Sequence, residues 1–361
     1  MKLLIAGGGT GGHIFPALAI AEQFKKEEPQ CKILFVGSHK GLEASVVPHK
    51  GFDITFIQQK PWVGKGLRSK IEVLLQFPKI YRQAKKILRD FKPDAVLGVG
   101  GYVSAPVLLA ASRLKFSTYL LEQNVIPGVT NKMMSYFVDT VFASFEETRQ
   151  YLPKRSCYVF GNPVRSDIVK VGLCKPQKST HPDAFRIFVM GGSQGAHVLN
   201  LAVIEMLDLF QISPKHIEIT HQTGALDYEM VCSEYKQREI SARIEKFIDD
   251  VASCYENTDL VIARAGAGVV SELIVTKTPS ILVPYPFAHG HQIHNAKILE
   301  SCGAARMILQ HDLSGEKIYK IILQLMTYEH SLEKMKQAFG DLNWSESSQK
   351  ILECIRKNIT S

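Results

Sequence analysis

The chain has 361 residues, of which 45% are hydrophobic and 22% charged, and its mean hydropathy is −0.01. This composition excludes an intrinsically disordered chain, and no apolar run reaches the ~18 residues of a membrane-spanning helix. The length predicts two domains at about 150 residues each. Seven dispersed cysteines without a CxxC pair argue against a disulfide framework or a zinc site and fit a reducing cytosol.

The formal net charge of +8 is concentrated in one segment. Residues 60–92 carry seven Lys and three Arg against Glu72 and Asp90, so the rest of the chain is neutral. A basic surface admits nucleic acid, anionic lipid or phosphorylated ligands as partners. Because no nucleic-acid reader motif accompanies the charge, no nucleic-acid partner is expected.

Short apolar runs alternate with longer stretches of helical spacing along the whole chain. Strands are predicted at 2–6, 32–36, 95–99, 118–121, 140–143, 186–190, 218–222, 260–263 and 280–283. These runs are apolar throughout, which is typical of parallel strands covered by helices on both faces. The fold class is therefore predicted as α/β, built from βαβ units.

Two segments half a chain apart look alike. The strand at 2–6 leads into the glycine-rich stretch 7–13, and the strand at 186–190 leads into a similar stretch at 191–197. Two Rossmann-like domains with parallel sheets are therefore expected, the first over 1–163 and the second over 164–344. A final helix at about 345–357 would pack back on the first domain.

Residues 7–12 satisfy G-x-G-x-x-G, the dinucleotide fingerprint. A nicotinamide site also needs an acidic residue at the end of the second strand, where this chain has Val36-Gly37-Ser38-His39. No nicotinamide cofactor is therefore predicted. An alternative is that these glycines only close a tight strand–helix turn.

The stretch 264–272 follows a predicted strand, turns at Gly266 and begins a helix. Its first backbone N–H groups would favour an anion such as a diphosphate. Glu272, one turn further along, could accept hydrogen bonds from the cis-diol of a ribose. The alternative is that Glu272 only complements the helix dipole.

Three histidines, His289, His291 and His294, follow the next predicted strand. Their spacing matches no zinc pattern, and no cysteine or carboxylate lies among them. No metal site is therefore predicted. Amide and imidazole groups at the carboxyl end of a strand suit hydrogen bonds to a sugar.

Six ordered motifs resemble those of the MurG-type transferases, which are UDP-N-acetylglucosamine–N-acetylmuramyl-(pentapeptide) pyrophosphoryl-undecaprenol N-acetylglucosamine transferases. The motifs lie at 8–13, 98–102, 122–124, 161–165, 191–196 and 271–292. The resemblance implies the GT-B fold, two Rossmann-like domains facing a cleft. It also implies transfer of N-acetylglucosamine from UDP-N-acetylglucosamine to the muramyl C4 hydroxyl of lipid I, an undecaprenyl-pyrophosphoryl-muramyl pentapeptide, giving lipid II for peptidoglycan.

The resemblance further implies a peripheral enzyme at the cytoplasmic face of the bacterial inner membrane, with cell-wall and division proteins among its partners. The chain has no Asp-x-Asp motif, so we expect metal-independent transfer with inversion at the anomeric carbon and no cofactor. A UDP-sugar epimerase or a glycolipid transferase of the same fold, and a non-catalytic scaffold, are the alternatives.

Substrate-binding residues follow from the resemblance position by position. They are Thr10, Gly11 and Gly12 near donor phosphate and acceptor; Asn124 and Gln292 at the donor sugar; Arg165 and Ser193 in the donor site; Ile248, whose backbone reads uracil; and Ala267, Gly268, Val269, Val270, Ser271 and Glu272 at diphosphate and ribose. The chain departs from the family where Leu121 replaces a histidine and Lys277-Thr278 replaces a glycine.

The general base should have a pKa near neutrality. His13 is the first candidate because its glycine turn places it at the predicted cleft, and Glu122 is the second. The alternative for His13 is a helix residue hydrogen-bonded to backbone.

The basic segment 60–92 is predicted to dock on an anionic membrane surface, because an acceptor with a lipid tail stays in the bilayer. Its apolar positions are Trp62, Val63, Leu67, Ile71, Leu74, Leu75, Tyr81, Ala84, Leu88 and Phe91, with Lys79, Arg82, Lys85, Lys86 and Arg89 between them. The alternative is an ordinary amphipathic helix with a core face and a solvated charged face.

Overall fold

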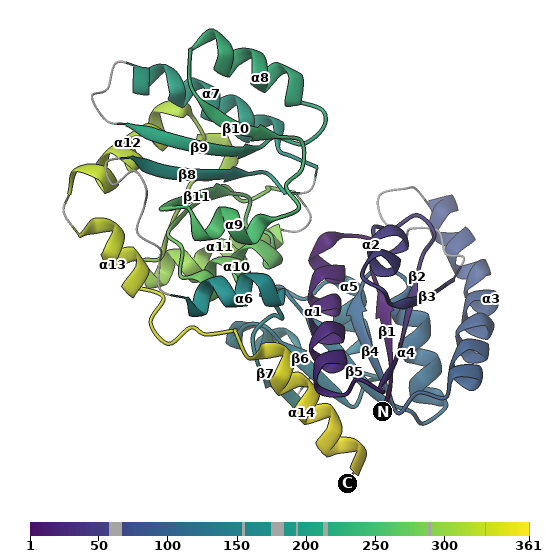
Figure 1. The fold of residues 1–361 in the computed structure, drawn as a ribbon. Coiled ribbons are helices and arrows are strands. Elements are labelled where there is room, and N and C mark those ends of the chain that lie inside the picture. The colour runs from purple at the N-terminus through teal and green to yellow at the C-terminus, as the bar shows by residue number, and fades with distance from the viewer. Residues whose placement is uncertain are drawn as a thin grey trace. The chain divides into compact units, whose positions relative to one another are not determined.

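The computed structural model describes residues 1–57, 67–153, 156–174, 184–192, 194–211, 216–287, 290–328 and 330–360, with backbone only for 67–75 and 360. The chain divides into two compact units. Unit 1 comprises Met1–Arg165 and Trp344–Ser361, and unit 2 comprises Ser166–Asn343. Each unit is built around one parallel sheet with helices on both faces (Figure 1).

Unit 1 contains a seven-stranded parallel sheet in the order β3-β2-β1-β4-β5-β6-β7. Its strands are β1 (Lys2–Gly7), β2 (Lys32–Gly37), β3 (Asp53–Phe56), β4 (Ala95–Gly100), β5 (Ser117–Glu122), β6 (Thr140–Ala143) and β7 (Ser156–Val159). Its helices are α1 (Gly11–Glu27), α2 (Glu43–His49), α3 (Leu67–Phe91), α4 (Ser104–Arg113), α5 (Val129–Met134) and α14 (Ser347–Thr360), with a 3-10 helix at Glu146–Tyr151.

The two faces of the unit 1 sheet are covered by different helices because side chains alternate along each strand. Leu3 and Ile5 of β1 pack with α1 and α14, whereas Leu4 and Ala6 pack with α3 and α4. Helix α14 lies along α1, where Arg356 forms ion pairs with Glu27 at 2.6 Å and Glu28 at 2.9 Å (Figure 1). The last helix of the chain therefore completes the core of unit 1.

Unit 2 contains a six-stranded parallel sheet in the order β10-β9-β8-β11-β12-β13. Its strands are β8 (Phe185–Met190), β9 (Ile217–Gln222), β10 (Ala242–Glu245), β11 (Leu260–Ala263), β12 (Ser280–Leu282) and β13 (Ala305–Met307). Its helices are α6 (Ser166–Leu173), α7 (His197–Gln211), α8 (Tyr228–Gln237), α9 (Val251–Glu256), α10 (Ala267–Thr276), α11 (His291–Cys302), α12 (Gly315–Thr327) and α13 (Ser331–Gln337), with a 3-10 helix at Gln310–Asp312.

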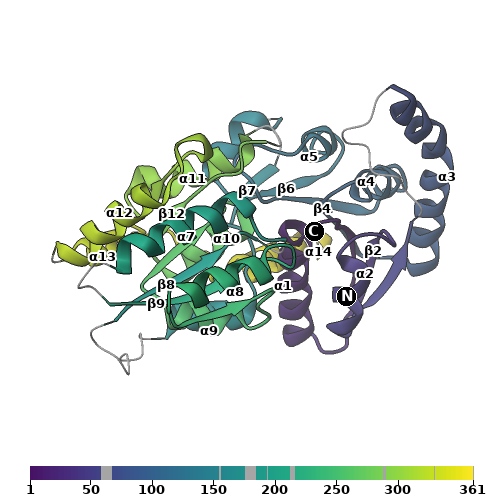
Figure 2. The same ribbon diagram turned by 90° about the horizontal axis from the view of Figure 1, so that it is seen from above.

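The helices of unit 2 form two layers around its sheet (Figure 1), and Figure 2 is seen from the side of α7 and α8. Helix α12 packs on α7 in one layer, and α6 packs on α9 and α10 in the other. The apolar side chains of Ile187 and Val189 in β8 pack against the α7 and α12 layer. The predicted α/β fold class with two parallel sheets is confirmed.

Helix α3 separates its apolar and basic residues. Ile80, Ala84 and Leu88 are buried in the core of unit 1, and Lys79, Arg82, Lys86 and Arg89 are exposed. The described part of the predicted apolar stripe therefore faces the core, and the exposed side of α3 is basic. Trp62 and Val63 lie outside the described residues. Among the helices that the structure describes, none is both long and apolar enough to cross a membrane.

Candidate active site

The predicted site residues gather at the carboxyl ends of the parallel strands, where open α/β sheets bind ligands. In unit 1 the strand order reverses between β1 and β4, and the turn of Gly7–Thr10 leaves β1 at this point. In unit 2 the reversal lies between β8 and β11, which lead into the turns before α7 and α10. Thr10, Gly11, Gly12, His13, Glu122, Asn124 and Arg165 belong to unit 1, and the other described site residues belong to unit 2.

The His13 ring is held by the glycine turn that precedes α1. Its Nδ1 lies 3.2 Å from Gly8 O and 3.3 Å from Thr10 Oγ1. Because a carbonyl oxygen only accepts, the proton must be on Nδ1, which leaves the lone pair on Nε2. Burial lowers the pKa of His13, and the bond to Gly8 and the charge of Glu43 raise it in part. The ring is therefore neutral near pH 7 and able to accept a proton at Nε2.

Gly100 leaves space for this ring. The glycine has a φ of 97°, and a Cβ there would lie 2.9 Å from His13 Nε2 and 3.4 Å from Asn131 Nδ2. Asn131 Nδ2 in turn donates to Glu122 Oε2 at 2.8 Å. The structure thus brings the two predicted base candidates to one place in unit 1, with Asn131 beside both.

Glu122 is 1% exposed, and both of its carboxylate oxygens accept hydrogen bonds. Oε1 accepts from the backbone N–H of Asn124 at 2.9 Å and from its Nδ2 at 3.2 Å. Oε2 accepts from Gly128 N at 3.1 Å and from Asn131 Nδ2 at 2.8 Å. Burial raises the pKa of Glu122, and these donors lower it in part. The carboxylate therefore shapes the loop that presents Asn124.

Arg165 lies over the first turns of α1 in unit 1. Its guanidinium carbon is 5.4 Å from the centre of the Phe15 ring, a cation–π distance. A Cβ at Gly11 would meet the same ring at 3.0 Å. The structure therefore places Arg165 beside the turn that holds Thr10, Gly11 and Gly12.

Sequence reasoning missed Glu43, the buried acid of this turn. Glu43 begins α2, is 1% exposed, and accepts from Gly9 N at 2.6 Å and from Ser38 N at 2.9 Å. The glycine turn thus has an internal anion where a dinucleotide-binding turn would present its N–H groups to phosphate. The signal that could have found Glu43 is an acid that follows Gly37-Ser38 at the end of β2.

The N-terminus of α10 is open in unit 2. Gly266 caps the helix, and a Cβ at Gly268 would meet no described atom within 4 Å. Val270 N–H already donates to Gly266 O, so the N–H groups available to an anion are those of Ala267, Gly268 and Val269.

The side chains that follow this helix tip differ in exposure. Val270 and Ser271 are buried, and the Ser271 hydroxyl donates to Ala267 O. Glu272 is half-buried and accepts from Tyr255 Oη at 3.0 Å. The backbone of the helix tip and the Glu272 carboxylate are therefore the groups that can bind a ligand here.

Ile248 is linked to the second glycine turn through Gln222, a residue that sequence reasoning missed. Gln222 is 2% exposed at the end of β9. Its Oε1 accepts from Ile248 N at 2.9 Å, and its Nε2 donates to Gly192 O at 3.0 Å. Because the Ile248 N–H is bound to Gln222, its carbonyl is the backbone group available to read a base.

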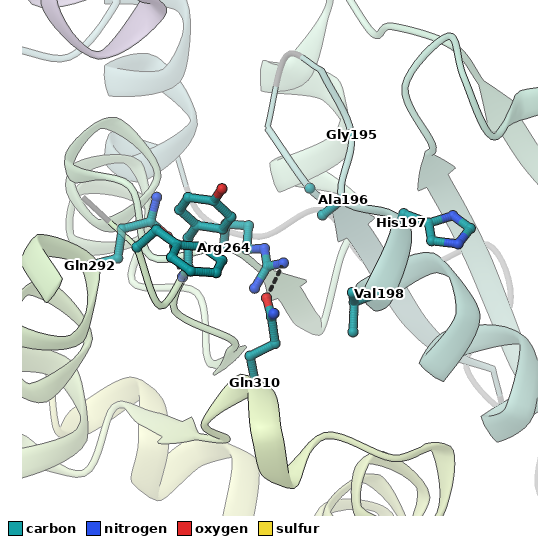
Figure 3. A pocket seen from close by; sticks show the side chains of 10 residues that line it. Gly195, Ala196, His197, Val198, Arg264, Gln292 and Gln310 are labelled. Carbon is teal, nitrogen blue, oxygen red and sulfur yellow. Dashed lines mark hydrogen bonds between the residues drawn. The ribbon is translucent and has the colours of Figure 1, made fainter. Parts of the chain in front are cut away.

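A cavity of about 500 Å³ opens in unit 2 between the starts of α7 and α11 (Figure 3). Its lining residues are Gly191, Gly195, Ala196, His197, Val198, Arg264, Tyr285, Phe287, Gln292 and Gln310. This lining contains an arginine, the N-terminus of α7 and no carboxylate among the described residues, so it favours an anionic or polar ligand.

Arg264 is the charged group of this cavity and is 8% exposed. It donates to Val283 O at 3.1 Å and, as Figure 3 shows, to Gln310 Oε1 at 2.7 Å. Burial lowers the pKa of Arg264. The sequence motif contained Arg264, but nothing in its spacing indicated that it would be buried beside neutral partners.

Gln292 lines the same cavity from the start of α11. Its Oε1 accepts from the Tyr285 N–H at 3.0 Å, so its amide NH2 is the group that can donate to a ligand. Ser193 and His289 lie outside the described residues. Among the residues that the structure does describe, no three His, Cys, Asp or Glu side chains form a group that could hold a metal ion.

His221 is a buried residue of the unit 2 core and lies outside the ligand cavity. Its Nδ1 contacts Tyr235 Oη at 3.0 Å, and its Nε2 contacts Asn200 Oδ1 at 3.1 Å. Burial lowers the pKa of His221 to about 3. This histidine is therefore neutral at physiological pH and acts in packing.

Two family models match the chain in order. Residues 3–143 match the glycosyltransferase family 28 N-terminal domain, and residues 186–352 match the glycosyltransferase family 28 C-terminal domain. The fold and these matches define a glycosyltransferase with two α/β domains.

Individual proteins that are similar to the chain identify its family within the glycosyltransferases more specifically. The chain is 42% identical over 354 residues to the UDP-N-acetylglucosamine–N-acetylmuramyl-(pentapeptide) pyrophosphoryl-undecaprenol N-acetylglucosamine transferase of Geobacter metallireducens, covering 98% of this chain and 97% of that protein. It is 27% identical to the crystal structure of Acinetobacter baumannii MurG, with a TM-score of 0.79 and 99% of both chains covered. The chain belongs to this family of N-acetylglucosamine transferases.

A third similarity concerns the fold alone. The UDP-GlcNAc 2-epimerase from Neisseria meningitidis, solved bound to UDP-GlcNAc, has a TM-score of 0.70 with 16% identity, covering 99% of this chain and 100% of that one. At 16% identity, this similarity concerns the fold and does not assign epimerase activity to this chain.

Proposed function

We propose that this glycosyltransferase transfers N-acetylglucosamine from UDP-N-acetylglucosamine to the muramyl C4 hydroxyl of lipid I, giving lipid II. The observation that carries the proposal is the open N-terminus of α10 with Glu272 one turn further along. A diphosphate at the helix tip and a ribose diol at Glu272 would together bind a UDP-sugar. The substrates named for the relatives fit this arrangement.

Unit 2 is proposed as the donor-binding domain. The N–H groups of Ala267, Gly268 and Val269 would stabilise the charge that develops on the departing UDP. Arg264 adds a buried positive charge in the neighbouring cavity, where Gln292 could donate to sugar hydroxyls. These groups supply the charge stabilisation from the protein itself, so metal-independent transfer is proposed at the donor site.

Unit 1 is proposed to bind the acceptor and to supply the base. His13 Nε2 would take the proton of the acceptor hydroxyl as that oxygen bonds to the anomeric carbon, and UDP would leave with the electron pair of the broken bond. A single displacement of this kind inverts the anomeric carbon. Glu122 is proposed to position Asn124, because among the described residues its carboxylate accepts from donors of unit 1.

Radiolabelled UDP-N-acetylglucosamine and a lipid I analogue test the proposal directly. The expected result is labelled lipid II with a β linkage, formed also after EDTA treatment. His13→Ala should lose far more kcat than donor affinity, since the ring acts on the acceptor. Incubation with the donor alone is the control, and a new sugar isomer there would favour an epimerase instead.

We further propose that unit 1 docks on an anionic membrane surface at the cytoplasmic face of the inner membrane. Support comes from the exposed Lys79, Arg82, Lys86 and Arg89 of α3. Helix α4 packs on both α3 and α5, and the exposed Val129, Met133, Tyr136 and Phe137 lie on or just after α5. Basic residues with exposed apolar side chains suit an anionic lipid surface. Cell-wall and division proteins are proposed as further partners on the resemblance alone.

A further inference from the structure

One peptide group connects two side chains in unit 1. The peptide between Gly8 and Gly9 presents its carbonyl oxygen to His13 Nδ1 at 3.2 Å. The N–H of the same peptide donates to Glu43 Oε2 at 2.6 Å. The carboxylate, the peptide and the imidazole are therefore joined in series by two hydrogen bonds.

The packing holds this arrangement closely. Glu43 is 1% exposed, and its other oxygen accepts from Ser38 N at 2.9 Å and Ser38 Oγ at 3.0 Å. Gly8 has a φ of 141°, and a Cβ there would lie 2.3 Å from the Glu43 carboxyl carbon. Only glycine allows the turn to approach the carboxylate this closely. A buried carboxylate needs such partners, and the peptide N–H is one of them.

We propose that Glu43 is a positioning residue for His13 and acts through the Gly8–Gly9 peptide. Its negative charge polarises the peptide, so that the Gly8 carbonyl becomes a stronger acceptor for the His13 Nδ1–H. The tautomer with its lone pair on Nε2 is thereby selected, and the imidazolium formed by proton transfer is stabilised. This inference rests on the proposed function in taking His13 as the base. The arrangement resembles a carboxylate–histidine pair with a peptide inserted between them.

The charged groups around His13 are few among the described residues. Glu43, at the start of α2, is linked to His13 through the Gly8–Gly9 peptide. Glu122, at the end of β5, accepts from Asn131, which lies beside Gly100 as His13 does. Thr10 Oγ1 is the other polar contact of Nδ1. Glu43 is the charge that raises the pKa of His13 against burial, so its removal should lower that pKa further.

Glu43→Gln removes the charge with little change of shape and is the central variant. We expect kcat to fall about tenfold to a hundredfold, with the donor KM within about twofold of wild type. The imidazole Cε1–H signal of His13 is assigned as the one that is lost in His13→Ala. In an NMR titration of this signal, the pKa of His13 in Glu43→Gln should be lower than in wild type. Its nitrogen shifts should also show a weaker preference for the Nδ1–H tautomer.

Ser38→Ala is the matched control, because it removes a hydrogen bond from the other oxygen of the same carboxylate and leaves the charge in place. It should keep the His13 pKa and tautomer and most of kcat. Glu43→Asp retains the charge and should keep the His13 pKa closer to wild type than Glu43→Gln. Thermal melts confirm that each variant is folded. If Glu43→Gln does not fold, the test is the comparison of Glu43→Asp with Ser38→Ala.

The proposal is overturned if Glu43→Gln lowers kcat with the His13 pKa and tautomer unchanged, since that result describes a structural role only. Equal shifts in Ser38→Ala and Glu43→Gln, or in Glu43→Asp and Glu43→Gln, would also overturn it. An active His13→Ala enzyme would instead refute His13 as the base, while the NMR readings would still report on the link between Glu43 and His13.

Discussion

Arg264 donates from Nη2 to Gln310 Oε1 at 2.7 Å, so a buried guanidinium meets a neutral amide at the ligand cavity of unit 2. A buried cation without a carboxylate in the cavity lining is costly unless an anion joins it during function. We therefore expect Arg264 to contribute positive charge to a bound anionic ligand.

Removing this charge should weaken transfer strongly. We expect Arg264→Gln to lower kcat/KM for the donor by about 10² to 10³, as when a charge-stabilising donor is lost from an active site. Steady-state kinetics with varied UDP-N-acetylglucosamine measure the effect.

Gln310→Glu is the matched test, because it leaves Arg264 in place and gives it an internal anion. We expect the donor KM to rise about tenfold, which corresponds to ~1.4 kcal/mol. An unchanged KM in this variant, together with a Tm near wild type, would contradict the assigned role of Arg264.

The buried His221 should make the stability of unit 2 depend on pH. Its pKa is about 3 in the folded protein against 6.5 for an unperturbed imidazole, so the unfolded state binds the proton more readily. The contribution of the neutral His221 side chain to the free energy of unfolding is fully present above pH ~6.5. It is lost as the pH falls toward 3, by about 1.4 kcal/mol per pH unit. Urea unfolding at pH 7, 6 and 5 measures this slope, and His221→Gln should flatten it.

Lys277 ends α10 in the left-handed conformation, with a φ of 51° and a ψ of 39°. Glycine adopts this conformation without a Cβ penalty. We expect Lys277→Gly to raise the free energy of unfolding by about 1 kcal/mol, measured by urea unfolding. Lys277→Ala, which keeps a Cβ, should bring no gain; a similar gain from both variants would point to the lysine side chain instead.

The exposed basic face of α3 should govern binding to anionic vesicles. Replacing Lys79, Arg82, Lys86 and Arg89 by Gln removes four charges, each worth ~1 kcal/mol near an anionic leaflet. We expect vesicle affinity to fall by about three orders of magnitude in a sedimentation assay. A variant with Lys236, Lys317, Lys320 and Lys334 of unit 2 changed to Gln serves as control and should bind like wild type.

The strands show how far local sequence pattern predicts this fold. All nine predicted strands are present, and the four that were missed are β3, β7, β10 and β13. These are the edge strands of the two sheets. An edge strand has one hydrogen-bonded neighbour and is partly exposed, so its sequence lacks the continuous apolar run that marks a central strand. In β10, for example, Ala242 and Ile244 alternate with charged residues.

Helix α3 shows the limit of a sequence pattern in another way. The spacing of its apolar and basic residues predicted an amphipathic helix but left two interpretations open. The burial of Ile80, Ala84 and Leu88 shows that the described apolar positions pack in the core. Among the side chains that the structure describes, exposed apolar residues of unit 1 include Val129 and Met133 of α5, a helix about 50 residues further along the chain.

The sequence by itself determined the α/β class, the two glycine turns and the helix start after Gly266, because each depends on residues that are close along the chain. It also determined the family, through the order of six such local motifs. The tertiary structure alone revealed Glu43, Gln222 and the neutral surroundings of Arg264. Glu43 reaches His13 across 30 residues of sequence because parallel strands bring successive loops to one edge of the sheet. Electrostatic interactions and hydrogen bonds depend on distance in space. The pKa shifts and hydrogen-bond partners of the site residues therefore follow from the folded sheet and not from the local sequence.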